Sequence, residues 1–246
     1  MTEKRTFDFA AGEVLLIDKP LEWTSFDAVN RIRAMIKRHL NLKLKVGHAG
    51  TLDPLATGLL IICTGKFTKR IEEFQAQEKE YTGTFVVGAT TPSFDLEHDI
   101  DRRFPVEHIT DERIHEATKK FTGMIAQVPP MFSAIKVEGK RAYELARKGE
   151  GSDIPPRQVE IREFDITRIE RPTALAGIEN EGEVIDVDFR VSCSKGTYIR
   201  SLARDFGTEL NSGAYLSKLR RTRIGDFRIE DAMTIDQLGL IVMGRV

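Results

Sequence analysis

The chain has 246 residues, of which 41% are hydrophobic, so it can bury a substantial core in one elaborated domain or in two. Lysine and arginine together number 37 against 38 aspartates and glutamates, and the net charge of -1 excludes a protein that binds nucleic acid through its overall charge. Any basic surface must therefore be local.

The cysteine and hydropathy patterns indicate a soluble protein of a reducing compartment. Cys63 and Cys193 are too few for a disulfide framework, and both lie in apolar, strand-like runs typical of buried thiols. No uncharged apolar run approaches the roughly 20 residues that span a bilayer, and the N-terminus lacks a signal-peptide pattern. We therefore expect a cytoplasmic protein without membrane attachment.

In the first part of the chain, several apolar runs predict strands and one segment with helical spacing predicts a helix. The run "EVLLIDKP" predicts a buried strand that ends in a turn, and Thr24 or Ser25 can then cap a helix. The apolar residues of this helix recur at helical spacing: Phe26, Val29, Ile32 and Ile36. The runs "LLIICTG" and "YTGTFVVGA" predict further strands.

The second part mixes helices and strands in the same way. Residues 111–121 have a helical period that stops at Gly123, and "IRSLARDFG" predicts a helix closed by Gly207. The run "SAIKV" predicts a strand, followed by a turn at 138–139, a short basic helix and a surface loop over 147–157. "EVIDVDFRVSC" predicts another strand. Because there is no regular βαβ rhythm, the class expected is α+β.

The stretch "GHAGTLDPLATG" contains a single carboxylate, Asp53, within a run suited to a turn. The following proline favours extended geometry at Asp53, and Gly50 and Gly58 allow sharp bends or close approach to a ligand. The loop therefore either presents this carboxylate for chemistry or uses it in an Asx-turn that only caps its own backbone.

Cofactor motifs are missing from the sequence. No Gly-x-x-x-x-Gly-Lys-Ser/Thr pattern and no Gly-x-Gly-x-x-Gly pattern follows a strand, and the five histidines show no metal-ligand spacing with each other or with the cysteines. We therefore expect neither a nucleotide cofactor nor a metal.

Two late segments contain polar side chains that are either functional or ordinary structural residues. In "SKGTYIRSLARDFG", Tyr198 and Arg200 lie where a strand turns into a helix. Either both are site residues, or Tyr198 is an ordinary core residue and Arg200 a solvated helix residue. "SKLRRTRIGDFR" is a solvated charged face or a groove for a nucleic-acid backbone. Its basic residues are Lys218, Arg220, Arg221, Arg223 and Arg228.

Six segments in this order resemble the TruB family of tRNA pseudouridine synthases. They are "LLIDKP", "GHAGTLDPLATGLL", "KEYTGTFVVG", "QVPPMFSAIKVEGKRAYELARKG", "SKGTYIRSLARDFG" and "YLSKLRRTRIGDF", and they cover roughly residues 13–228. The resemblance implies the pseudouridine synthase fold, in which helices flank a mixed, largely antiparallel sheet. It implies conversion of the T-loop uridine of tRNA, position 55 in tRNA numbering, to pseudouridine without cofactor or metal.

The resemblance also implies roles for individual residues. Asp53 is the catalytic aspartate, which could attack the ribose, attack the base or remove a ribose proton. Arg200 pairs with it, Tyr81 stacks on the flipped uracil, and His48 fills the gap that the nucleotide leaves. The remaining expected substrate contacts are Lys19 in the floor of the site, Tyr198 and Leu219 in its wall, and Lys136, Arg141, Arg220 and Arg221 along the RNA backbone.

The domain organisation implied is one catalytic domain over residues 1–246, with an insertion at about 124–152 that grips the T stem-loop. The residues after Arg228 are too few for the PUA domain found in many bacterial members, so we expect a short form of the family. We also expect a monomer. Two alternatives remain open: a relative that depends on a guide RNA, and a non-catalytic chaperone that helps tRNA to fold.

Overall fold

The computed structural model describes residues 7–133, 135–137, 140–141, 154–171 and 183–244. Contacts divide the chain into two compact units, unit 1 (Met1–Glu80 and Arg220–Val246) and unit 2 (Tyr81–Leu219). Within the described ranges, no helix is long and apolar enough to cross a membrane. The single catalytic domain expected from the sequence stays a prediction, and each unit is taken by itself below.

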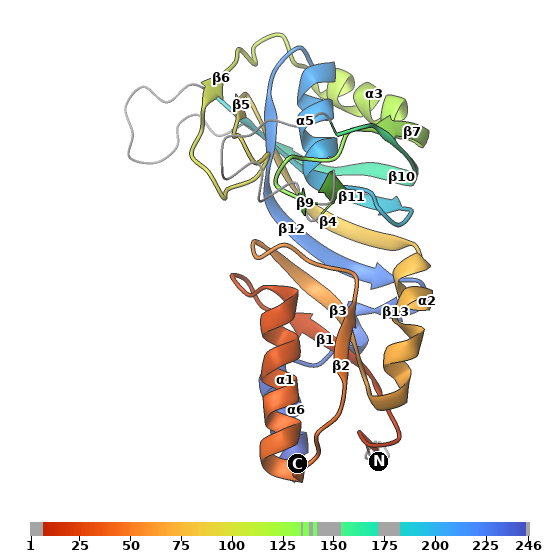
Figure 1. The fold of residues 1–246 in the computed structure, drawn as a ribbon. Coiled ribbons are helices and arrows are strands. Elements are labelled where there is room, and N and C mark those ends of the chain that lie inside the picture. Colours follow the sequence, from red (N-terminus) through yellow and green to blue (C-terminus); the bar gives the residue numbers. More distant parts are fainter. Residues whose placement is uncertain (1–6, 134, 138–139, 142–153, 172–182, 245–246) are drawn as a thin grey trace. The chain divides into compact units, whose positions relative to one another are not determined.

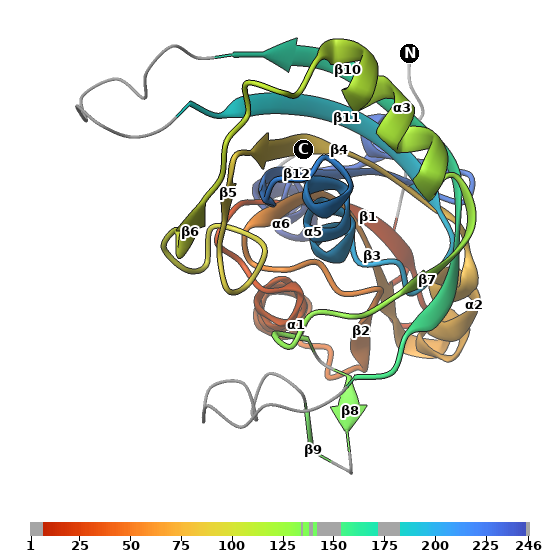
Figure 2. The ribbon, with the colours of Figure 1, turned by 90° about the horizontal axis from the view of Figure 1, so that it is seen from above.

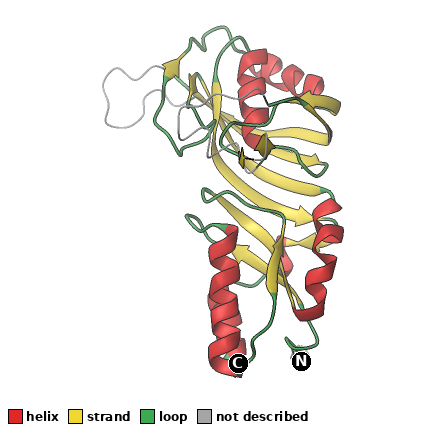
Figure 3. Cartoon of the chain, viewed as in Figure 1, coloured by secondary structure: helices red, strands yellow, loops and turns green. Residues whose placement is uncertain are grey.

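Unit 1 is a sheet with helices on both faces (Figures 1 and 3). In its sheet β1 and β2 both pair antiparallel with β3, which neighbours β12, and β12 pairs with β13. Its elements are β1 (Val14–Lys19), α1 (Ser25–Leu40), β2 (Val46–Ala49), β3 (Ala56–Thr64), η1 (Gly65–Arg70), α2 (Ile71–Ala76), β13 (Phe227–Arg228), η2 (Ile229–Asp231) and α6 (Ile235–Val242), with the first residues of β4 (Lys79–Val87) and the last of β12 (Ala214–Ile224).

Local sequence explains where α1 begins and which face it buries. Thr24 is the N-cap: its side chain accepts a hydrogen bond from the backbone N of Asp27, whose carboxylate accepts one from the backbone N of Thr24. The apolar face of α1 packs with α6 against one side of the sheet, around Ile32 and Leu238. Phe74 of α2 belongs to the separate cluster on the other side.

Unit 2 is built on a curved, largely antiparallel sheet in the order β12-β4-β11-β10-β7. The long strands β10 and β11 run side by side, with α3 lying along them (Figure 2). The further elements of this unit are β5 (Ala89–Thr90), β6 (Arg102–Arg103), α3 (Asp111–Phe121), β7 (Gly123–Gln127), β8 (Lys136–Val137), β9 (Lys140–Arg141), β10 (Arg157–Glu170), β11 (Ile185–Cys193) and α5 (Ile199–Glu209).

An aromatic cluster forms the core of unit 2. The ring of Phe85 in β4 stacks on that of Phe189 in β11 with centroids 4.2 Å apart, and Phe164 of β10 and Phe206 of α5 complete the group. These aromatic contacts bury large apolar areas and attach α5 to the sheet. The helix that carries Arg200 is therefore packed against the sheet through Phe206.

Most expected elements are confirmed, as is the α+β class. Helix α3 spans the predicted residues, and the two cysteines are buried in β3 and β11. Gly207 does not close α5, which continues to Glu209. The glycine allows close packing instead, because a Cβ at this position would lie 2.3 Å from the backbone N of Ala214. The predicted basic helix and most of the predicted loop at 147–157 lie outside the described residues.

Candidate active site

Asp53 lies in the turn between β2 and β3 of unit 1, and its side chain is half-buried. Gly50 (φ +92°) and Gly58 (φ +103°) flank this turn in a backbone region that favours glycine. The backbone N of Ala56 donates to the backbone O of Asp53 at 3.0 Å, which closes the turn. The geometry predicted from the two glycines is therefore present.

Four described residues hold the rest of this turn through its backbone. The Ser25 hydroxyl contacts both the N and the O of Leu52, at 2.8 and 3.2 Å. The backbone N of Glu22 donates to the O of Pro54 at 2.9 Å, and the Lys19 ammonium lies 3.4 Å from the same oxygen. The Arg221 guanidinium donates to the O of Gly50 at 3.1 Å. The position of Asp53 is therefore set from both sides.

Arg221 is a frame for this loop and is not placed to contact RNA. Its side chain is 1% exposed, and its Nε donates to the backbone O of Leu59 at 2.7 Å. A Cβ on Gly58 would lie 2.3 Å from the backbone O of Arg221, so the neighbouring strands β3 and β12 approach each other here at a distance that only glycine permits. The expected phosphate contact of Arg221 is therefore corrected: its guanidinium is committed to backbone carbonyls.

Lys19 is completely buried at the end of β1. Its ammonium donates to the backbone O of Pro20 at 2.8 Å and of Trp23 at 2.6 Å. Burial lowers the pKa of Lys19 from 10.5 to about 8, an effect that the nearby Asp53 carboxylate opposes and Arg221 reinforces. The role expected for Lys19, supporting the floor of the site, stays a prediction.

His48 lies in β2 and is also half-buried. Burial and the positive charge of Arg221 lower its pKa, and a backbone hydrogen bond with Gly50 opposes them. The Nδ1 atom is buried and has no hydrogen-bond partner among the described residues. The lowered pKa favours the uncharged imidazole, and the role expected for His48, filling the gap left by the nucleotide, stays a prediction.

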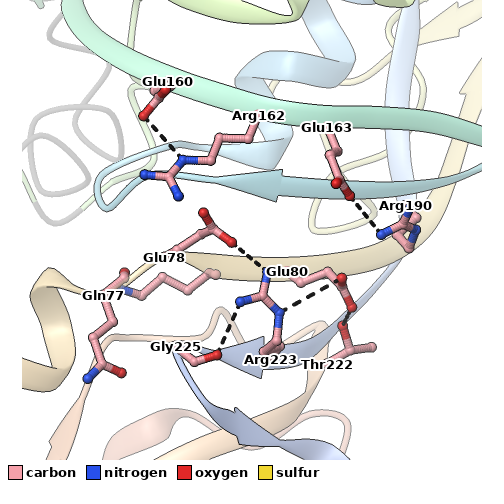
Figure 4. Close-up of polar contacts among 11 residues, drawn as sticks. Gln77, Glu78, Glu80, Glu160, Arg162, Glu163, Arg190, Thr222, Arg223 and Gly225 are labelled. Atoms are coloured by element: carbon pink, nitrogen blue, oxygen red, sulfur yellow. Dashed lines mark hydrogen bonds and ion pairs between the residues drawn. The ribbon is translucent and has the colours of Figure 1, made fainter.

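The other arginines of the basic stretch in unit 1 are largely paired with acids. Arg220 forms a two-pronged ion pair with Asp18, at 3.0 and 2.7 Å, on the edge of a pocket of about 570 Å³. Arg223 contacts Glu78 at 2.5 Å and lies 4.0 Å from Glu80, as Figure 4 shows. Internal pairing thus explains much of this charge, although Arg220 stays partly exposed.

In unit 2, Arg200 occupies the first turn of α5 and is 5% exposed. Its guanidinium donates to the backbone O of Ser93 at 3.3 Å and of Phe132 at 2.9 Å, and its Nε lies 3.5 Å from the Asp95 carboxylate. Phe94, between two of these partners, has φ +62°, a strained conformation for a bulky residue. A tight turn therefore presents Asp95 to Arg200.

The remaining expected site residues lie in defined elements of unit 2. Tyr81 is a buried residue of β4, and Leu219 a half-buried residue of β12. Tyr198 is the N-cap of α5, where both its backbone N and O bond the amide of Gln127, at 2.8 and 3.1 Å. This double contact fixes the start of the helix that carries Arg200.

The structure thus brings Lys19, His48, Asp53 and Arg221 together in unit 1. Arg200 belongs to the other unit, so its pairing with Asp53 stays a prediction.

The remaining expected site residues, Lys136 and Arg141, are paired in register between β8 and β9, and their side chains are outside the described atoms. Ser25 and Asp95 were missed, because an isolated serine and an isolated aspartate give no local signal. Within the described ranges, no group of three His, Cys, Asp or Glu residues could hold a metal ion.

Two family descriptions match consecutive parts of the chain. "TruB family pseudouridylate synthase (N terminal domain)" matches residues 37–199. "tRNA pseudouridylate synthase B C-terminal domain" matches residues 200–243.

Curated relatives and solved structures are also similar to this chain. A tRNA pseudouridine synthase B of Flavobacterium johnsoniae is 57% identical over 93% of this chain and 95% of its own length. Another, of Thermobifida fusca, is 44% identical over 93% of this chain and 74% of its own length. A chain from the crystal structure of a Cbf5-Nop10-Gar1 complex is 29% identical with a TM-score of 0.65, and the match covers 97% of this chain and 57% of that one. The chain therefore belongs to the TruB family of pseudouridylate synthases.

Proposed function

We propose that this pseudouridine synthase converts the uridine at position 55 in the T loop of tRNA, and that Asp53 is its catalytic carboxylate. The observation that carries the proposal is the Asp53 turn, whose backbone is held by Ser25, Glu22, Lys19 and Arg221. Such fixed backbone geometry around one acid is what positioned chemistry requires, and an Asx-turn would not need it. The curated relatives named tRNA pseudouridine synthase B support tRNA as the substrate.

The reaction needs no atoms from outside the substrate. The bond between ribose C1′ and base N1 breaks, the base turns, C1′ bonds to C5, and the proton lost from C5 is balanced by one gained at N1. A carboxylate can assist by attacking the ribose or the base, or by removing a ribose proton. We assign one of these steps to Asp53. Because a carboxylate can assist the reaction by itself and no outside atoms are needed, the proposal includes neither a metal nor a cofactor.

The other site residues act on the nucleotide that leaves its stack. Tyr81 stacks on the flipped uracil, Tyr198 and Leu219 contribute the wall of its pocket, and His48 fills the gap left in the T loop. Arg200 orients the Asp53 carboxylate. Lys136, Arg141 and Arg220 contact phosphates, and the insertion around residues 124–152 grips the T stem.

The experiment compares the variants Asp53→Asn and Glu22→Gln. Each purified protein, with no other protein or RNA added, is assayed for pseudouridine formation in a tRNA transcript. Both variants remove one negative charge, but the contact of Glu22 with the turn is made by its backbone N and survives. Asp53→Asn should abolish pseudouridine formation and leave tRNA affinity within about tenfold, whereas Glu22→Gln should remain active.

Product mapping tests the position and the alternatives in the same experiment. Pseudouridine should appear at position 55 and vanish when that uridine is replaced by cytidine. An active Asp53→Asn variant, or a product at another position, would contradict the proposal. A requirement for an added guide RNA would favour the guide-dependent relative, and an inactive wild-type protein that speeds tRNA folding would favour the chaperone.

A further inference from the structure

The hydroxyl of Ser25 makes a reciprocal contact with one residue of the Asp53 turn. It accepts a hydrogen bond from the backbone N of Leu52 at 2.8 Å and lies 3.2 Å from the backbone O of the same residue, to which it donates. A hydroxyl can do both at once, since it has one proton and two lone pairs. The contact joins the start of α1 to the residue immediately before Asp53.

This contact is not part of the ordinary start of a helix. The N-cap of α1 is Thr24, which forms the complete capping box with Asp27. Ser25 is the first helical residue, it is 2% exposed, and its hydroxyl forms hydrogen bonds with Leu52. Its hydroxyl therefore serves the Asp53 turn, while its neighbour serves the helix.

The backbone of Leu52 has a particular need for such a partner. Residues 50–55 lie between β2 and β3, outside the strand ladder, and Leu52 itself is 3% exposed. A buried N–H and C=O without a ladder partner must be satisfied by other groups, and here one hydroxyl satisfies both. Arg221 and Lys19 bond the turn at Gly50 and Pro54, so Ser25 holds the middle of the segment between them.

We propose that Ser25 is a positioning residue for Asp53: by fixing both backbone groups of Leu52, it sets the direction in which the Asp53 carboxylate points. This inference rests on the proposed role of Asp53. The Ser25 hydroxyl contacts Leu52, the residue immediately before Asp53, and does not itself touch the substrate. Loss of its hydroxyl leaves Asp53 in place but lets the turn move, and catalytic groups lose rate steeply with displacements of about 1 Å.

The test compares Ser25→Ala with Thr24→Ala, which removes the neighbouring hydroxyl and the helix cap but no contact to the turn. Each variant is measured by single-turnover pseudouridine formation, by tRNA affinity and by amide hydrogen exchange of residues 50–55. Ser25→Ala should lower the single-turnover rate about 10- to 100-fold and speed exchange of this segment, with affinity within about twofold. Thr24→Ala should keep the rate, although it destabilises α1.

Conservative variants of Ser25 separate the effect of its hydroxyl from the effect of side-chain volume. Ser25→Thr keeps the hydroxyl and should restore the rate to within about threefold of wild type. If Ser25→Ala does not fold, Ser25→Cys takes its place, because the thiol has a similar volume and is only a weak hydrogen-bond partner.

The outcomes distinguish this inference from the proposed function. If Ser25→Ala lowers the rate no more than Thr24→Ala, or leaves exchange of residues 50–55 unchanged, the positioning role is wrong while an inactive Asp53→Asn upholds the proposed function. If Asp53→Asn is active, the proposed function is wrong, and faster exchange in Ser25→Ala then shows only that the hydroxyl anchors the turn.

Discussion

Replacing Lys19 by methionine should change how stability depends on pH. Burial lowers the pKa of Lys19 from 10.5 to about 8 in the folded protein, while the unfolded chain keeps the ordinary value. At neutral pH the group is charged in both states and carries a constant penalty. Between the two pKa values the unfolded state binds more protons than the folded state, so the free energy of unfolding rises with pH. With these pKa values the rise is about 2 kcal/mol from about pH 7 to about pH 9.5.

Urea unfolding of wild type and Lys19→Met across this range measures the effect. Other titrating groups are shared, so they largely cancel in the difference between the two proteins, which should move by about 2 kcal/mol in favour of wild type as pH rises. If the difference in the free energy of unfolding between the two proteins stays constant within about 0.5 kcal/mol, the pKa of Lys19 is not lowered by burial and the reasoning is refuted. In an Asp53→Asn background the rise should begin at lower pH, because the Asp53 carboxylate raises the pKa of Lys19.

Three further predictions concern stability and reactivity. Gly58→Ala should lower the free energy of unfolding by at least about 2 kcal/mol, since φ is +103° and the new Cβ would lie 2.3 Å from the backbone O of Arg221; a loss below about 0.5 kcal/mol would contradict the close crossing. Asp95→Asn should cost about 3 kcal/mol in denaturant unfolding, because it removes the carboxylate 3.5 Å from the buried Arg200, and an unchanged midpoint would argue against the pair. The Cys63 thiol, whose pKa burial raises to about 11, should react with a thiol reagent at about pH 8 only when the protein unfolds, and rapid labelling of the native protein would show that β3 is accessible.

Local features of the sequence predict much of this fold. The start of α1 is visible at Thr24 because an N-cap needs only residues within one turn, and α3 is visible because its apolar period and its cap are local. Glycines flanking Asp53 predict the turn for the same reason. Roles for Asp53, Tyr81 and Arg200 come from the family resemblance. Spacing alone left an Asx-turn as the alternative for Asp53 and a solvated helix residue as the alternative for Arg200.

Distant partners account for what the sequence did not predict. A basic run in β12 is read as solvated or RNA-facing, yet Arg221 is buried and Arg223 pairs with Glu78, because the chain brings acids and carbonyls from the N-terminal segment to this strand. The partners of Ser25 and Asp95 are likewise far along the chain. Spacing along the chain therefore could not have predicted which loop Ser25 supports or which cation Asp95 faces.

The bond between Arg221 and Gly50 joins residues 171 positions apart, so distant parts of the chain must meet before the contacts around the Asp53 turn are complete. During synthesis on the ribosome, the turn emerges long before its guanidinium partner does. A nascent chain that has not yet reached β12 cannot make this bond, even though Asp53 has already been synthesised. The set of contacts around the Asp53 turn is therefore completed late in translation, and products terminated before Arg221 should contain Asp53 without this hydrogen bond.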